Sequence, residues 1–190
     1  MRWPHNFRQF VVLLAAMVCL STAVVLIAAA GLPERADFTG QIMPDGQPVA
    51  PEIGAVAPPF QAVSLNGDTL NSLELRGQPV IINFWATWCE PCRLEMPALQ
   101  AFYQRHQQQG LRLLAVNLGE DPAAVQDWAQ QYGLTFDILL DEGRQIAALY
   151  QLRGQPSTYV LSPSGVITHI VYGPVTEPML QSALSPYWSG

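Results

Sequence analysis

The chain contains no lysine, and all nine of its basic residues are arginines. Fifteen Asp and Glu residues oppose them, which gives a formal net charge of −6 over 190 residues. Without Arg2 and Arg8, close to the start of the chain, seven arginines face fifteen acidic residues, a balance of −8. Binding of nucleic acid depends on a basic surface, so this composition argues against a nucleic-acid partner.

Cysteine is also scarce, with Cys19, Cys89 and Cys92 the only three. Cys19 lies in an apolar run, where a small apolar filler is the expected role; the residues before it do not suit lipid attachment. The other two could form half of a zinc site or a structural disulfide. However, no second Cys or His pair follows at zinc-ligand spacing. A lone pair three positions apart favours a redox-active dithiol.

Charge is absent from residues 10–30, a run of apolar residues long enough to span about 30 Å as a helix. Arginines precede this run and acidic residues follow it, so the sequence predicts residues 1–9 in the cytoplasm and the chain after Gly31 outside it. The competing interpretation is a cleaved signal peptide, because Ala28-Ala29-Ala30 would suit cleavage before Gly31. We expect a transmembrane anchor at 10–30.

Residues 31–51 contain four prolines and few large apolar side chains, so we expect a flexible linker; a hairpin packed on the domain is the alternative. The folded domain is predicted over residues 52–190, as a single α/β sheet. Its expected strands are 60–65 and 69–70 (a hairpin), 80–85, 111–117, 136–140, 157–161 and 166–172. Its expected helices are 91–109, 122–132, 142–150 and 179–184.

The most informative stretch is Trp88-Cys89-Glu90-Pro91-Cys92, between the predicted strand 80–85 and the helix that follows. One helical turn brings both sulfurs to one side, and the helix N-terminus stabilises a thiolate at Cys89. We expect Cys89 to be the more exposed, attacking cysteine and Cys92 to be the resolving cysteine. The reaction then needs no cofactor beyond the redox-active disulfide.

Neighbouring residues are expected to tune this chemistry. Glu90 places a carboxylate beside Cys89, which disfavours the thiolate and favours a reducing enzyme. Pro91 fixes the backbone at the helix start. Glu95 follows Cys92 by three residues and could accept its proton, although an exposed helix glutamate fits the periodicity equally well. His106 and His169 are expected to be structural.

The stretch from Asn83 to Pro97 resembles the active site of the TlpA/ResA-like branch of the thioredoxin superfamily, and the likeness runs from about Val56 to Pro174. The resemblance implies a thioredoxin fold with an N-terminal β-hairpin and an inserted strand–helix element, here Asp121 to Leu140. It also implies a buried acidic residue at Glu95. Thioredoxins proper have an acidic residue where this chain has Asn83, a departure that fits the TlpA/ResA-like branch.

The same resemblance implies that Pro156 is cis and faces the dithiol, with Gln155 and Trp88 toward the substrate. Trp85 and Trp88 are expected to pack around the active-site turn. Members of this branch usually take electrons from a membrane thiol transporter and reduce protein disulfides outside the cytoplasm. Their substrates include the haem-attachment cysteines of apocytochrome c and the cysteines of copper-site proteins.

Two other functions remain open on the sequence. A copper chaperone of this fold typically has three residues between its cysteines and a distal histidine, whereas this chain has two and only His169 as a candidate. A thiol peroxidase would need a Thr-x-x-Cys arrangement, but Thr87 precedes Cys89 by two positions.

Overall fold

The computed structural model describes residues 14–19, 21–22 and 46–188, and the chain divides into two compact units, Met1–Phe38 and Thr39–Gly190. In the first unit, residues 14–19 and 21–22 are helical. Within the described ranges, none of the helices combines the length and the apolar character that crossing a membrane requires. Most of the predicted anchor, and the predicted linker up to residue 45, lie outside the described residues.

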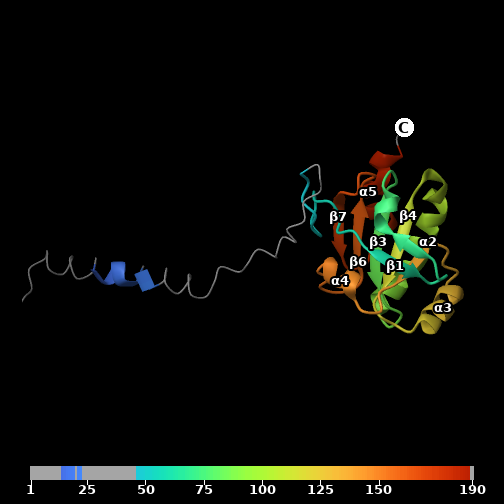
Figure 1. Cartoon of the computed structure of the whole chain (residues 1–190), viewed down its shortest axis with the longest axis horizontal. Helices are drawn as coiled ribbons and strands as arrows, with labels where there is room; N and C mark the ends of the chain where they lie inside the picture. Colours follow the sequence, from blue (N-terminus) through green and yellow to red (C-terminus); the bar gives the residue numbers. More distant parts are fainter. Residues whose placement is uncertain (1–13, 20, 23–45, 189–190) are drawn as a thin grey trace, which may run out of the picture. The chain divides into compact units, whose positions relative to one another are not determined.

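The second unit is built on one seven-stranded sheet with the order β2-β1-β5-β4-β3-β6-β7 (Figure 1). The strands are β1 (Gln61–Ser64), β2 (Thr69–Asn71), β3 (Val80–Trp85), β4 (Arg112–Asn117), β5 (Asp137–Leu140), β6 (Ser157–Leu161) and β7 (Ile167–Tyr172). The helices are α2 (Glu90–His106), α3 (Pro122–Gln131), α4 (Gln145–Leu149) and α5 (Glu177–Leu184), with short 3₁₀ helices η1 (Ser72–Leu75), η2 (Gln107–Gln109) and η3 (Ser185–Tyr187).

Strand pairing confirms the predicted α/β class. β3 runs parallel to β4 and antiparallel to β6, and β6 and β7 pair antiparallel. β1 and β2 form the N-terminal hairpin. The element predicted at Asp121 to Leu140 is α3 followed by β5, which pairs with β4 on one side and β1 on the other. This element therefore joins the hairpin to the rest of the sheet.

Two apolar cores cover the two faces of the sheet, and β3 contributes to both. Ile81 and Trp85 belong to the core that includes α2, α3 and α5, whereas Ile82 and Phe84 belong to the core that includes α4. Every residue of β3 is buried, as expected for a central strand. Because side chains alternate along a strand, Asn83 lies on the α2 face with Ile81 and Trp85.

The domain begins earlier than predicted. The Ala50 N–H donates to the Val56 carbonyl, the Val56 N–H donates to the Pro48 carbonyl, and Val49 and Ala50 are buried. The predicted linker 31–51 is therefore wrong over its last residues, because two apolar side chains between prolines suffice to hold this segment on the domain.

The helices differ from their predicted bounds at one or both ends, and two of them, α2 and α4, differ most. The helix predicted to reach Gln109 ends at His106, and η2 and Gly110 (φ 87°) complete the turn. The helix predicted over 142–150 begins only at Gln145, because the Asp141 carboxylate accepts hydrogen bonds from the N–H groups of Ile146 and Ala147. Both differences reflect capping contacts that periodicity does not reveal.

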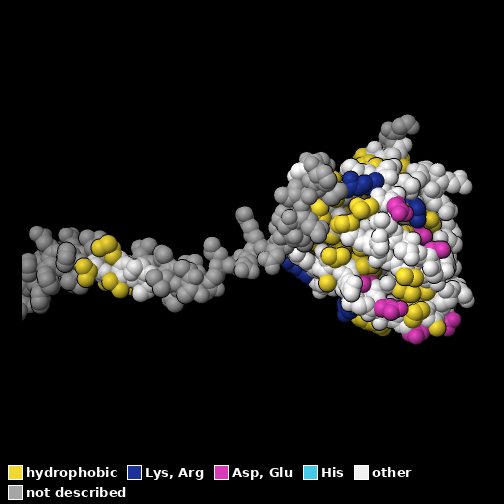
Figure 2. All heavy atoms as spheres, in the orientation of Figure 1, with side chains coloured by type: hydrophobic (Ala, Val, Ile, Leu, Met, Phe, Trp, Pro, Cys, Tyr) yellow, Lys and Arg dark blue, Asp and Glu magenta, His cyan; other side chains and the backbone are white. Residues whose placement is uncertain are grey.

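The surface agrees with the composition. On the face in Figure 2, acidic side chains gather mainly where α3 lies, and the few arginines are scattered. Apolar side chains are spread between them rather than confined to one area. This face therefore offers no basic patch.

Candidate active site

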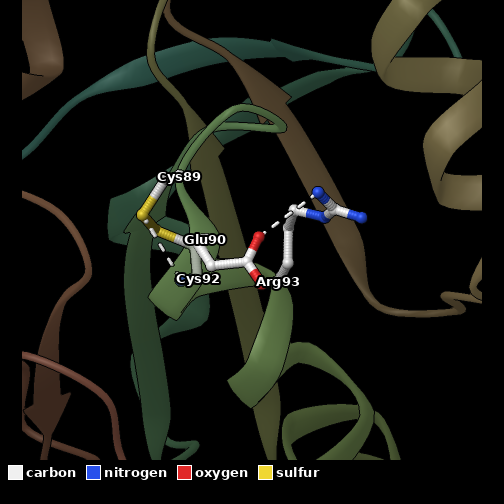
Figure 3. A network of polar contacts seen from close by, with 4 residues as sticks. All are labelled: Cys89, Glu90, Cys92 and Arg93. Carbon is white, nitrogen blue, oxygen red and sulfur yellow. Dashed lines mark hydrogen bonds and ion pairs between the residues drawn. A yellow bond between two sulfur atoms is a disulfide. The ribbon is translucent and has the colours of Figure 1, made fainter.

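The two cysteines lie where β3 passes into α2. Cys89 is the N-cap residue of α2, and its Sγ accepts a hydrogen bond from the Cys92 N–H at 3.3 Å. The two form a disulfide, with their Cα atoms 5.3 Å apart (Figure 3). Cys89 is 5% exposed and Cys92 is fully buried. The predicted order of exposure is confirmed, although Cys89 itself is only slightly exposed.

Glu90 points toward Arg93 rather than toward the sulfurs (Figure 3). Its Oε2 lies 3.3 Å from Nη1 of Arg93, and its side chain is 71% exposed. Solvent and the paired guanidinium both screen this carboxylate, so its repulsion of a Cys89 thiolate is weaker than the sequence argument assumed. Pro91 lies in the first turn of α2, as predicted.

Glu95 faces inward from α2 and is only 3% exposed. Its Oε1 accepts a hydrogen bond from Nδ2 of Asn83 at 2.8 Å, and its Oε2 accepts one from the Val175 N–H at 2.7 Å. Burial raises the pKa of Glu95 to about 7, although these two hydrogen bonds act in the opposite direction. Of the two interpretations that periodicity allowed for Glu95, the buried one is correct.

Asn83 links this carboxylate to strand β6. Its Nδ2 also donates to Oγ1 of Thr158 at 3.0 Å, and the two residues are register partners in the β3–β6 pair. Thr158 follows Pro156 by two residues, and the Gln155–Pro156 peptide bond is cis, as the resemblance implied. Pro156 thus precedes β6 at the end of β3 that leads to Cys89.

The two tryptophans of this region behave differently. Trp85 is fully buried, and the centroid of its ring lies 4.7 Å from the ring centroid of Trp128. Trp88, next to Cys89, is 65% exposed. The expectation that both pack around the turn is therefore wrong for Trp88, whose position before the N-cap directs it to solvent. Gln155, the other residue expected to face the substrate, is half-buried.

Comparison with known proteins identifies the group. Residues 53–170 match the AhpC/TSA family. The chain belongs to this family. Thiol-disulfide oxidoreductase ResA of Bacillus subtilis (strain 168) is 36% identical over 132 residues, which cover 70% of this chain and 74% of that protein. ResA of Geobacillus kaustophilus is 33% identical over 160 residues, which cover 84% and 88%.

Solved structures of known proteins share this fold. StoA from Bacillus subtilis has a TM-score of 0.60 and 30% identity, over 67% of this chain and 97% of that one. A thiol:disulfide interchange protein of the thioredoxin family from Chlorobium tepidum has a TM-score of 0.64 and 24% identity, over 70% and 96%, a likeness of fold.

These findings confirm the TlpA/ResA-like resemblance. The chain is a thiol–disulfide oxidoreductase with a thioredoxin-like fold, acting on protein thiols and disulfides. In this AhpC/TSA-family group, redox-active cysteines carry the reaction and no cofactor is needed.

Sequence reasoning missed Glu120, which braces the loop before Cys89. Its carboxylate accepts hydrogen bonds from the N–H and Oγ1 of Thr87, and from Nδ2 of Asn117 at 2.6 Å. Glu120 follows β4, which runs parallel to β3, and the carboxyl ends of parallel strands meet at one edge of the sheet. An acidic residue at this place in the sequence could therefore have been predicted to lie near the cysteines. Thr87 is thereby engaged with Glu120, which gives no support to a peroxidase arrangement.

The two histidines within the described residues lie apart from this chemistry. His106 stacks on Trp188 with ring centroids 4.1 Å apart, and His169 is exposed on β7 beside Thr168. Among the described residues, no group of three or more His, Cys, Asp or Glu side chains could hold a metal ion. The copper-chaperone interpretation gains no support from these positions.

Proposed function

We propose that the chain reduces disulfides in proteins outside the cytoplasm, with Cys89 as the nucleophile. The Cys89 thiolate attacks a substrate disulfide, forms a mixed disulfide and releases one substrate thiolate. Cys92 then gives its proton to Glu95 and attacks Sγ of Cys89, which releases the second substrate thiolate. Two electrons pass from the enzyme dithiol to the substrate, and the released thiolates take up two protons.

The observation that carries this proposal is the buried Glu95, one helical turn after Cys92. A general base works best when its pKa is near the working pH, and burial brings the pKa of Glu95 to about 7. The residue is anchored from β3 and from the segment before α5, so its carboxylate has a fixed place. An exposed helix glutamate would offer neither property.

The proposed direction of electron flow rests on the start of α2. Thiolate stabilisation by a nearby cation makes a disulfide oxidising, but the charge of Arg93 is paired with Glu90. The expected reduction potential of the Cys89–Cys92 couple is therefore below about −200 mV, as in thioredoxin-like reductants, and can be measured against dithiothreitol. A value near about −120 mV would mean an oxidant and would contradict the proposed direction.

The roles of the two cysteines are tested by trapping. Cys92→Ser should accumulate mixed disulfides between Cys89 and its protein substrates, because the resolving thiol is absent. The matched variant Cys89→Ser should capture none, since its remaining thiol is fully buried. Non-reducing electrophoresis followed by mass spectrometry reads both results. Equal capture by the two variants would argue against the assigned roles.

The proposed setting is the outer face of a membrane, with residues 1–9 in the cytoplasm, an anchor at 10–30 and a linker that ends before Pro48. The proposed electron donor is a membrane thiol transporter, and apocytochrome c or a copper-site protein is the proposed substrate. Trp88, Gln155 and Pro156 are proposed to face that substrate. Protease added to intact cells should degrade the domain and spare the anchor.

A further inference from the structure

Asn83 has an unusual set of contacts for a buried residue. Its Nδ2 donates to both Glu95 and Thr158, whereas its Oδ1 has no hydrogen-bond partner among the described residues. The side chain is fully buried in the middle of β3. Unpartnered polar atoms at such depth are rare in folded proteins, so the Oδ1 of Asn83 needs an explanation.

These contacts suit only one protonation state of Glu95. Both carboxylate oxygens accept from N–H groups, those of Asn83 and Val175, which satisfies an ionised carboxylate. A protonated Glu95 carries an O–H donor that needs an acceptor, and neither of these partners presents one in this arrangement. Burying an unpaired donor is costly, so the neutral acid requires a different contact.

We propose that Asn83 is a positioning residue that reverses its side-chain amide when Glu95 takes up a proton. After the reversal, Oδ1 accepts the Glu95 O–H, and the Thr158 hydroxyl turns from accepting to donating toward the same oxygen. One end of the amide lacks a partner in both states, so the reversal changes which atom is unpartnered and not how many. The use of this reversal in the reaction rests on the proposed role of Glu95 as proton acceptor.

The residue type at position 83 matters for this reason. The two ends of an amide have nearly the same shape, but one donates and the other accepts. Asp would fill the same space with acceptors only and would place a second carboxylate against Glu95. Leu would fill it with no polar atom. Asparagine alone among these can follow the proton on Glu95 without moving β3 or α2.

Within the part of the chain that the structure describes, no charged group of a neighbouring element acts on Glu95. The groups that act on Glu95 come from β3 (Asn83) and from the N–H of Val175, and both are neutral. β6 adds the neutral hydroxyl of Thr158, and the cysteines lie within α2 and at its N-cap. Arg105 of α2 and Glu177 of α5 pair with each other, and His169 of β7 is exposed. The Asn83 amide is therefore the side-chain group whose hydrogen bonds should change when Glu95 gains or loses its charge.

The direct test is a titration of the full chain, oxidised and in detergent, labelled with ¹³C and ¹⁵N. The Glu95 side-chain carboxyl carbon and the Asn83 side-chain NH₂ are followed by NMR between pH 5 and pH 9. Both should change with the same midpoint. Nuclear Overhauser contacts between the NH₂ group and Glu95 should be present at pH 9 and lost at pH 5. Contacts that persist at both ends of the range would overturn the reversal.

Three variants sharpen the test. Asn83→Leu should raise the Glu95 midpoint by about one pH unit, because the ionised form loses a charge-assisted donor. Asn83→Asp should raise it further, through repulsion between two carboxylates. Thr158→Val, which leaves the Asn83–Glu95 contact in place, should shift it by less than Asn83→Leu. An unchanged midpoint in Asn83→Leu, or an equal shift in Thr158→Val, would overturn the assignment to Asn83.

This titration separates the inference from the proposed function. It uses the oxidised protein without substrate, so it reports only on the Glu95–Asn83 pair. If exchange rates prove independent of Glu95 while the two NMR signals titrate together, the proposed catalytic role fails and the amide reversal stands. If exchange depends on Glu95 but the amide does not respond, the reversal fails alone.

Discussion

Helix α2 carries two glutamates near its start, Glu90 and Glu95, in opposite environments. Glu90 is exposed and paired with Arg93, whereas Glu95 is buried against neutral donors from β3 and from the segment before α5. Glu90 is the nearer of the two to Cys89 along the chain. It is Glu95, however, whose pKa is raised to about 7, because its carboxylate has lost most of its water.

The contrast shows that the environment of a carboxylate, more than its distance along the sequence, decides its influence on the cysteines. An exposed charge beside a cation is screened, so its effect on nearby groups is small. A desolvated carboxyl can exchange a proton in the physiological range. We therefore expect substitutions of Glu95 to change the chemistry of the site and substitutions of Glu90 to change it little.

The largest expected effect is on the rate of exchange. Glu95→Gln should slow the resolution step about 100-fold or more, which is the usual contribution of a positioned proton acceptor. The rise of the wild-type rate between about pH 6 and pH 8 should disappear in this variant, because the group that titrates there is gone. Stopped-flow reaction of the reduced protein with a disulfide peptide measures both quantities.

Glu90→Gln is the matched control on the same helix, and its rate should stay within about threefold of the wild type. If the two variants lose rate equally, or if Glu95→Gln keeps the wild-type pH profile, Glu95 is not the proton acceptor and the environments of the two carboxylates do not determine the rate.

The second effect is on stability. In the folded protein Glu95 titrates near pH 7, against about 4.5 for an ordinary glutamate. Between these values the folded state holds a proton that the unfolded state has lost, so stability decreases as pH rises through this window. The expected loss is about 3 kcal/mol by pH 8. Denaturant unfolding of the oxidised protein at several pH values measures this loss.

Glu95→Gln removes the titrating group, so its stability should be nearly constant across the same window. Glu90→Gln should follow the wild-type curve. A wild-type protein that becomes more stable between pH 5 and pH 8 would show that the carboxyl is ionised at little cost and would contradict its burial.

Much of the fold was predictable because it depends on local patterns. The continuous apolar run at Val80–Trp85 predicted a central strand, and Asp121-Pro122 predicted the start of α3. Where pairing outside the regular strands decides, prediction failed. Val49 forms an isolated β-bridge with Val56 and the Ala50 N–H donates to the Val56 carbonyl, whereas composition alone placed both residues in a linker.

The site shows the same limit. The Cys-x-x-Cys spacing predicted the redox pair, since one helical turn determines it. The partners of Glu95 come from residues 12 and 80 positions away along the chain, and Thr158 lies 75 positions from Asn83. Helical periodicity therefore left Glu95 undecided between a buried and an exposed position. The sequence also shows Arg93 three residues after Glu90. The prediction for Glu90 did not take into account that this cation would screen its carboxylate.

The smallest expected effect comes from the exposed pair. An exposed ion pair contributes at most about 1 kcal/mol, so Glu90→Gln should raise the reduction potential of the Cys89–Cys92 couple by no more than about 20 mV. Arg93→Gln removes the cation and should lower the potential by a similar amount, because Glu90 then acts unscreened. Both shifts should fade as salt is raised toward about 1 M, where the screening length falls to about 3 Å. Equilibration with dithiothreitol at low and high salt measures them. A shift above about 60 mV in Glu90→Gln, unaffected by salt, would mean that Glu90 and not Glu95 is the carboxylate that governs the cysteines.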